Sequence, residues 1–266
     1  MPIQLDVSTI FFTSAIVGGM GLLLLLRASP GRWDSWFLYW VGFSALQPLV
    51  SLMNGFRPVL PLTVAVVGAN LLQIMAVALL WAGVRSLRGR PAPAWAIAAA
   101  PLAWGLACFI PDFVATPSAR VGLLIPLIFV LFVATAFEAW MIHREQGTLG
   151  TLDLAVLLGL VSVGVVLRIL GVFDAPVPVG PGGALFLAIL TCVVPFLALS
   201  VANERRHLED VARFRSIGRM SSLGEMAAGL AEELRTPLAI TGLAVRNVVD
   251  AVENGDGEGR RFALDL

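Results

Sequence analysis

The chain has 266 residues, of which 58% are hydrophobic and only 14% are charged, whereas a soluble domain is about 45–50% apolar and about 25% charged. This composition excludes a disordered, collagen-like or disulfide-scaffold protein and argues against a wholly soluble one. The 18 basic and 18 acidic residues balance, so nucleic acid is not an expected partner. The two cysteines, Cys108 and Cys192, lie in apolar runs and indicate neither a disulfide nor a metal site.

The density of charge changes sharply near Asn203. The first 202 residues carry 16 charged side chains, whereas the last 64 carry 20. All the basic residues are arginine, and the absence of lysine excludes a retinal protein, whose chromophore is held on a lysine amine. We therefore predict a membrane domain over residues 1–202, followed by a water-exposed helical region.

Seven stretches of the first 202 residues are apolar and long enough to be considered as membrane spans. A span needs about 20 residues to cross about 30 Å of hydrocarbon, and the fourth stretch is the shortest. The sequence thus predicts an all-α membrane protein with seven transmembrane helices, at roughly 8–26, 34–53, 62–84, 94–110, 121–142, 151–172 and 183–202.

The arginines predict the orientation of these helices. Cytoplasmic links are enriched in basic residues, and one set of links, with the C-terminal flank, carries eight arginines: Arg27, Arg32, Arg85, Arg88, Arg90, Arg144, Arg205 and Arg206. The opposite set carries only Arg57 and Arg120. We therefore expect the N-terminus outside and the C-terminus in the cytoplasm.

Four polar residues of the predicted spans are candidates for sensing a ligand. Gln47, Asn70 and Gln73 lie deepest, and Asn70 and Gln73 share a helix face because they are three residues apart. They either form a ligand pocket or hydrogen-bond between helices. Arg168 lies near the outer end of the sixth span, where it either senses a ligand or anchors the helix by reaching the headgroups or a nearby aspartate.

Residues 203–216 are predicted to form a linker helix that continues from the last span. Apolar residues recur from here at mostly three- and four-residue spacing, which is typical of an amphipathic helix that pairs with a second copy. Asn254–Gly257 predicts a turn, and a returning helix begins near Arg260. The apolar row comprises Leu208, Val211, Ile217, Met220, Leu223, Met226, Leu230 and Leu234.

The run from Arg219 to Ile240, RMSSLGEMAAGLAEELRTPLAI, closely resembles the first helix of the dimerisation and phosphoacceptor domain of bacterial sensor histidine kinases, which typically reads LGEMAAGLAHELRTPL. The resemblance covers only this cytoplasmic part of the chain. It implies that residues 217–266 are a truncated dimerisation domain of a two-component signalling protein, an incomplete helical hairpin, in the bacterial inner membrane.

The resemblance also assigns residues to the site, with one departure. Glu232 stands where the family has its phosphoaccepting histidine, and a carboxylate cannot form the phosphoramidate that an imidazole forms. Glu233 corresponds to the general base and Thr236 to the residue that orients water for dephosphorylation. Pro237 corresponds to the proline that bends the helix, as the loss of a backbone N–H should do.

No ATP-binding domain follows by Leu266, so we expect no cofactor in this chain and no autophosphorylation by it alone. ATP and Mg²⁺ are expected only with such a domain. The implied partners are a second copy of the chain, membrane lipids, a cytoplasmic response regulator and an intact kinase.

Three interpretations of the chain follow from the resemblance. It is part of a longer kinase, a natural regulator, or a chain altered at position 232; the first and third are favoured. The alternative is a transporter or channel with a regulatory cytoplasmic tail.

Overall fold

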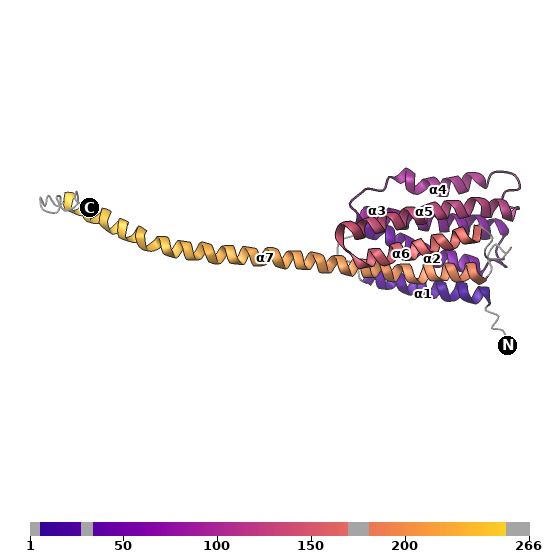
Figure 1. Ribbon diagram of the computed structural model, residues 1–266, viewed down its shortest axis with the longest axis horizontal. Coiled ribbons are helices and arrows are strands. Elements are labelled where there is room, and N and C mark those ends of the chain that lie inside the picture. Colours follow the sequence, from indigo (N-terminus) through magenta and orange to yellow (C-terminus); the bar gives the residue numbers. More distant parts are fainter. Residues whose placement is uncertain (1–5, 28–33, 170–180, 254–266) are drawn as a thin grey trace. The chain divides into compact units, whose positions relative to one another are not determined.

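The computed structural model describes residues 6–27, 34–169 and 181–253, and everything regular in these ranges is helical. The chain divides into two compact units, Met1–Arg206 and His207–Leu266, which are described separately. The first unit is a helical bundle (Figure 1). Its elements are α1 (Val7–Arg27), α2 (Ser35–Gly55), the π-helix η1 (Val64–Gly68), α3 (Ala69–Leu87), α4 (Ala94–Ala107), α5 (Pro117–Gln146), α6 (Leu149–Ile169) and the start of α7 (Pro181–Glu253).

Five helical segments of the described chain are long and apolar enough to cross a membrane. They are α1, α2, η1 with α3, α5, and α6 as far as Val166. The predicted fourth span corresponds to α4, which has 14 residues and is therefore about 21 Å long, shorter than the hydrocarbon core. The predicted seventh span falls on the start of α7, where the side chains of 181–187 lie outside the described residues.

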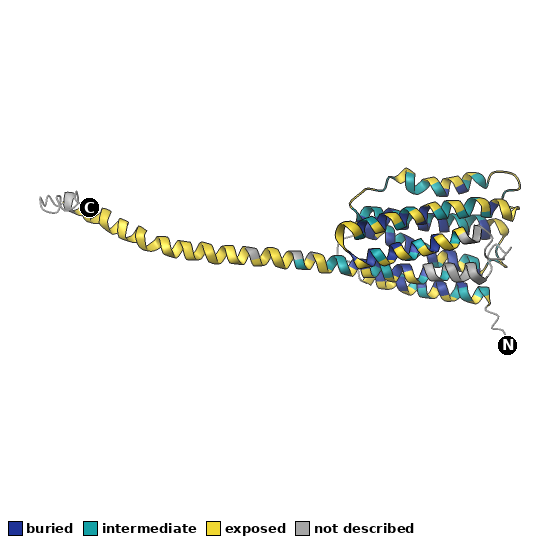
Figure 2. Cartoon of the chain, in the orientation of Figure 1, coloured by how far each residue is buried: buried dark blue, intermediate teal, exposed yellow. Residues whose placement is uncertain are grey.

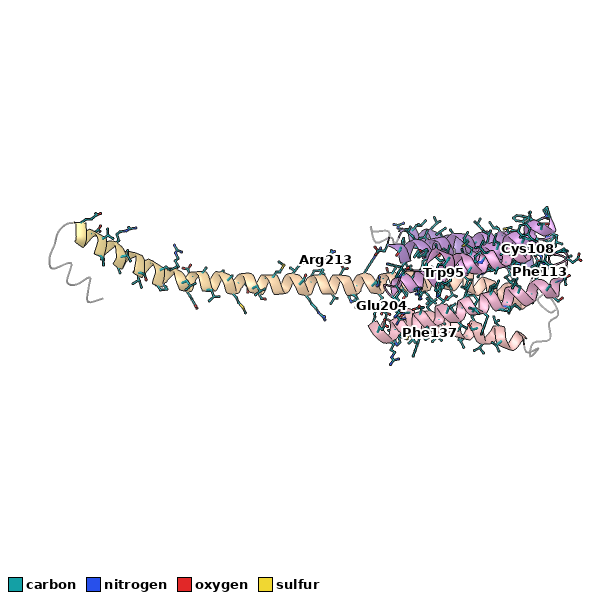
Figure 3. All side chains as sticks on the ribbon, turned by 90° about the horizontal axis from the view of Figure 1, so that it is seen from above. Trp95, Cys108, Phe113, Phe137, Glu204 and Arg213 are labelled. Atoms are coloured by element: carbon teal, nitrogen blue, oxygen red, sulfur yellow. The ribbon has the colours of Figure 1, made fainter. Side chains whose placement is uncertain are left out.

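The shorter α4 nevertheless extends along the bundle together with the turn that follows it. Figure 3 shows Trp95 toward the end of the bundle that carries Glu204, and Cys108 and Phe113 toward the other end. The indole of Trp104 donates a hydrogen bond to the carbonyl oxygen of Val67, at 3.4 Å, and thereby joins α4 to η1. This hydrogen bond places α4 against the π-helical part of the third segment.

Close helix packing in the bundle depends on small residues. A Cβ at Gly83 of α3 would collide with the indole of Trp40 on α2, and a Cβ at Gly18 of α1 would lie 2.5 Å from Thr191 Cγ2 on α7. Membrane helices approach closely through such residues because lipid supplies no hydrophobic force between them. The core gathers mainly around α2, which contributes buried Phe37 and Trp40, and α3, which contributes buried Ile74 (Figure 2).

Local signals set the helix ends. The carboxylate of Asp6 accepts hydrogen bonds from the hydroxyl of Thr9 at 2.9 Å and from the backbone N–H groups of Ser8 and Thr9. The Thr9 hydroxyl, followed by the Ser8 amide, lowers the pKa of Asp6, which therefore stays ionised at the start of α1. Gly147 ends α5 in the left-handed conformation, at φ 70°, and its N–H bonds to the His143 carbonyl.

The second unit contains the rest of α7. Its described side chains are exposed except that of Val211, which is partly buried (Figure 2). The predicted apolar row is therefore open to solvent in the single chain, with Met220 74% and Leu230 59% exposed. The described part of α7 extends to Glu253; the predicted turn and the returning helix lie in 254–266, outside the described residues.

Candidate functional site

Six charged residues form a collar at one end of the bundle: Arg85, Arg88, Glu138, Glu145, Glu204 and Arg205. Glu138 on α5 is shared by two arginines, with Oε1 2.9 Å from Arg85 Nη1 and Oε2 3.0 Å from Arg88 Nη1. Arg88 also contacts Glu145, 2.5 Å from Nη2 to Oε1. The side chains of Arg88 and Glu138 are only 7% and 8% exposed, so this central pair is shielded from water, whereas Arg85 and Glu145 are 30% and 44% exposed.

Hydrogen bonds to Glu145, and after it to Glu138, raise the pKa of Arg88 above its already high value. The guanidinium is therefore a permanent cation that both carboxylates need. Because Arg88 directly follows α3 and both acids lie on α5, the collar ties the ends of these two helices together.

Two consecutive residues of α7 attach this helix to the same end. Glu204, labelled in Figure 3, accepts the backbone N–H of Leu149 at 2.9 Å and that of Gly150 at 3.1 Å. A carboxylate is favourable there because these are free donors at the positive end of α6. Arg205 donates to the carbonyl oxygen of Leu87 at 3.0 Å, and its guanidinium lies 5.8 Å from the Trp36 ring centroid.

The contacts of Glu204 and Arg205 hold α7 to three other helices. Glu204 binds the first residues of α6, while Arg205 binds the last carbonyl of α3 and lies over a tryptophan of α2. The backbones are also close, since a Cβ at Gly150 would lie 2.8 Å from Val201 Cγ2. A movement of α7 at this level would therefore have to break or carry these contacts.

No hydrogen bond among the described side chains joins the predicted sensor residues to one another. Gln47 is fully buried, where its Oε1 accepts a long hydrogen bond of 3.5 Å from Thr191, and its Nε2 has no partner. Gln73 is also buried, and its Oε1 has no partner. Asn70 is partly buried and lines a small cavity near the start of α3. Arg168 belongs to α6, but its side chain lies outside the described residues.

An apolar groove of about 390 Å³ runs between α5 and α6. Phe137 and Trp140 on α5 and Val156 on α6 line it (Phe137 is labelled in Figure 3). Its hydroxyl, on Ser162, is already bonded to the Leu158 carbonyl. The groove thus has room for hydrocarbon, and the only polar side-chain groups of its lining are this hydroxyl and the Trp140 indole N–H.

The residues assigned by resemblance lie on the exposed part of α7. Glu232 pairs with Arg235 at 3.6 Å, and both side chains are more than 70% exposed, so the pair contributes little stability. Glu233 and Thr236 are exposed as well. The helix continues through Pro237, whose missing N–H leaves the Glu233 carbonyl without its usual donor.

The described residues contain no group of three or more His, Cys, Asp or Glu side chains that could hold a metal ion. Comparison with protein-family models, with curated proteins and with solved structures finds no match to the chain. What bears on function is therefore the residues themselves: the kinase-like run on α7 and the charged collar that precedes it.

The collar was not predicted from the sequence. A signal for it exists, since Arg85 and Arg88 are three residues apart and Glu138 and Glu145 are seven apart, so that each pair lies on one helix face. Both pairs also fall at the end where the predicted topology gathers arginines. The pairing of acids with arginines depends on how each helix is rotated about its axis. Apolar residues lie almost all round each helix, so the sequence does not specify that rotation.

Proposed function

We propose that the chain is a membrane sensor of the two-component histidine kinase type. Seven spans over 1–202, with the N-terminus outside and the C-terminus in the cytoplasm of a bacterial inner membrane, would receive a cue. A dimeric linker helix over 203–216 would relay it to a truncated dimerisation domain over 217–266. With Glu232 at the phosphoacceptor position, the chain itself is an acceptor-less regulator, and an intact kinase or a further domain supplies ATP.

The observation that carries this proposal is the run from Arg219 to Ile240. Its residues match the kinase segment almost continuously, and a transporter tail has no physical reason to carry both the apolar spacing and the Glu-Leu-Arg-Thr-Pro run at 233–237. The exposure of the apolar row supports the dimer, since a helix with Leu223 64% and Leu234 57% exposed needs a second surface to cover it.

The attachment of α7 supports a relay. Glu204 and Arg205 hold the helix to α6, α3 and α2 directly before the second unit begins. A cue that alters the packing of these helices would change the position of α7 through these contacts, and α7 continues as helix to Glu253. Signal transfer physically requires an element with two states whose balance is shifted from one end, and we propose that α7 is this element.

The test restores the missing acceptor. The variant Glu232→His is co-assembled with an intact bacterial histidine kinase whose own acceptor histidine has been removed, and labelled ATP is added. We expect acid-labile, alkali-stable phosphate on this chain, because an imidazole nitrogen now attacks the γ-phosphate. The additional change Glu233→Gln should lower labelling by about a hundredfold, since it removes the general base.

Glu232→Gln is the matched control and should take up no label. If Glu232→His stays unlabelled in heterodimers whose formation has been verified, the phosphotransfer interpretation of 219–240 is wrong. Robust substrate flux through the wild-type chain in vesicles would instead favour the alternative of a transporter or channel with a regulatory tail.

A further inference from the structure

A small cavity lies at the end of the bundle opposite the collar. Its volume is about 60 Å³, whereas one water needs about 10–15 Å³, so the cavity has room for a group of a few heavy atoms. The end of α2, the following turn, η1 with α3, and the first turns of α5 line it. The polar lining residues are Asn54, Arg57, Asn70 and Arg120.

Arg120 is the unusual residue of this cavity. It is only 8% exposed, and its Nε atom is buried without a hydrogen-bond partner. A guanidinium has five donors and no acceptor, and leaving one buried and unpaired costs free energy unless an anion or water satisfies it. Within the described parts of the chain, no carboxylate forms an ion pair with Arg120 or Arg57.

A second guanidinium, that of Arg57, adds to the positive charge at the cavity. Arg57 and Arg120 line the same cavity, so their like charges repel each other. The described acids of this end form no ion pair with them: Asp6 caps α1, and Asp112 lies exposed on the turn after α4. Two like charges are thus held together with nothing described between them.

The remaining lining favours an anion too. Pro117 is the first residue of α5, whose N-cap makes no side-chain hydrogen bond, so the positive end of the helix dipole is close to the cavity. The amide of Asn70 is free to donate, whereas that of Asn54 is bonded to the Val50 carbonyl at 2.9 Å. The wall from η1 is a π-helical turn, a feature frequent at functional sites.

We propose that this cavity binds one oxyanion group, a carboxylate or phosphate, between the guanidinium groups of Arg57 and Arg120. Planar guanidinium forks match the geometry of such groups. The group belongs either to a soluble molecule or to a lipid headgroup. The binding requires neither a dimer nor phosphotransfer, so its failure would leave the proposed sensor function untouched.

The test uses the full chain, purified without lipid in a neutral detergent. Sodium phosphate and sodium acetate are titrated at ionic strength kept constant with sodium chloride, and phosphatidylglycerol is titrated separately. Tryptophan fluorescence gives the dissociation constant, because the Trp104 indole is bonded to η1 beside the cavity. The melting temperature is recorded in parallel and should rise by about 2–5 °C near saturation.

A response to phosphate or acetate identifies a soluble ligand, and a response to phosphatidylglycerol alone identifies a headgroup; both support the site. Arg120→Met and Arg57→Met should each weaken binding at least tenfold. Arg213→Met is the control for loss of one positive charge, since Arg213 is exposed on the second unit (Figure 3), and it should bind like the wild type. The proposal fails if no anion binds, if chloride competes as well as phosphate does, or if both cavity variants bind normally.

Discussion

The two ends of the bundle use the same residue type in opposite ways. At the collar, Arg85 and Arg88 share the carboxylate of Glu138, and Arg205 has a carbonyl acceptor. At the other end, Arg57 and Arg120 line one cavity, and no acid of the described residues lines it with them. The difference lies in what the neighbouring helix offers: an acid makes arginine a structural tie, and its absence leaves the charge available for a ligand.

The largest expected effect comes from breaking the collar at Glu138. In Glu138→Gln, two arginines lose their shared carboxylate, and a buried charge without its partner is strongly destabilising. We expect the melting temperature in detergent to fall by roughly 5 °C or more. Asp153→Asn is a control, because Asp153 lies in an apolar helix and forms no ion pair among the described residues. A similar fall in the melting temperature of Asp153→Asn would show that the collar has no special role in stability.

A smaller effect is expected from Glu204→Gln. The amide retains one acceptor oxygen but loses the negative charge at the start of α6, an interaction of about 0.3–1 kcal/mol. The melting temperature should fall by about 1–4 °C. In Glu232→His chains paired with an ATP-supplying kinase, this variant should also change the level of labelling, while Glu253→Gln, at the far end of α7, should not. Unchanged labelling in Glu204→Gln would show that the relay does not use this contact.

The helices themselves were largely predictable from the sequence, because a run of about 20 apolar residues needs a helix to satisfy its backbone in lipid. The predicted span 34–53 corresponds to α2 and 151–172 to α6. The fourth span was overestimated: Ala94–Ala107 is helical, but the apolar residues from Cys108 on form turns, and apolarity alone does not distinguish the two. The π-helical start of the third segment was not predicted either, since no residue signal specifies an i→i−5 pattern.

The candidate sites were less predictable, since they depend on contacts between distant segments. Arg57 and Arg120 were recognised only as the minority arginines of the predicted outer links, and their shared cavity follows from the packing of α5 against the third segment. Gln47 and Gln73 were expected to lie deep in the spans, but the sequence does not show which buried amide atoms would lack partners. The exposed kinase-like run is the opposite case, because its interpretation rests on residue order alone.

The comparison between the two ends is tested most directly by one matched pair of substitutions, Arg88→Met and Arg120→Met, each compared with the wild type by melting temperature in a neutral detergent at low anion concentration. Methionine keeps an unbranched stem and removes the charge and the donors. The account predicts opposite signs. Arg88→Met lowers the melting temperature because it leaves Glu145 without its ion-pair partner and Glu138 with Arg85 alone, and Arg120→Met raises it because it removes an unpaired buried charge. A fall in both variants would contradict the account, because Arg120 would then be a structural tie like Arg88.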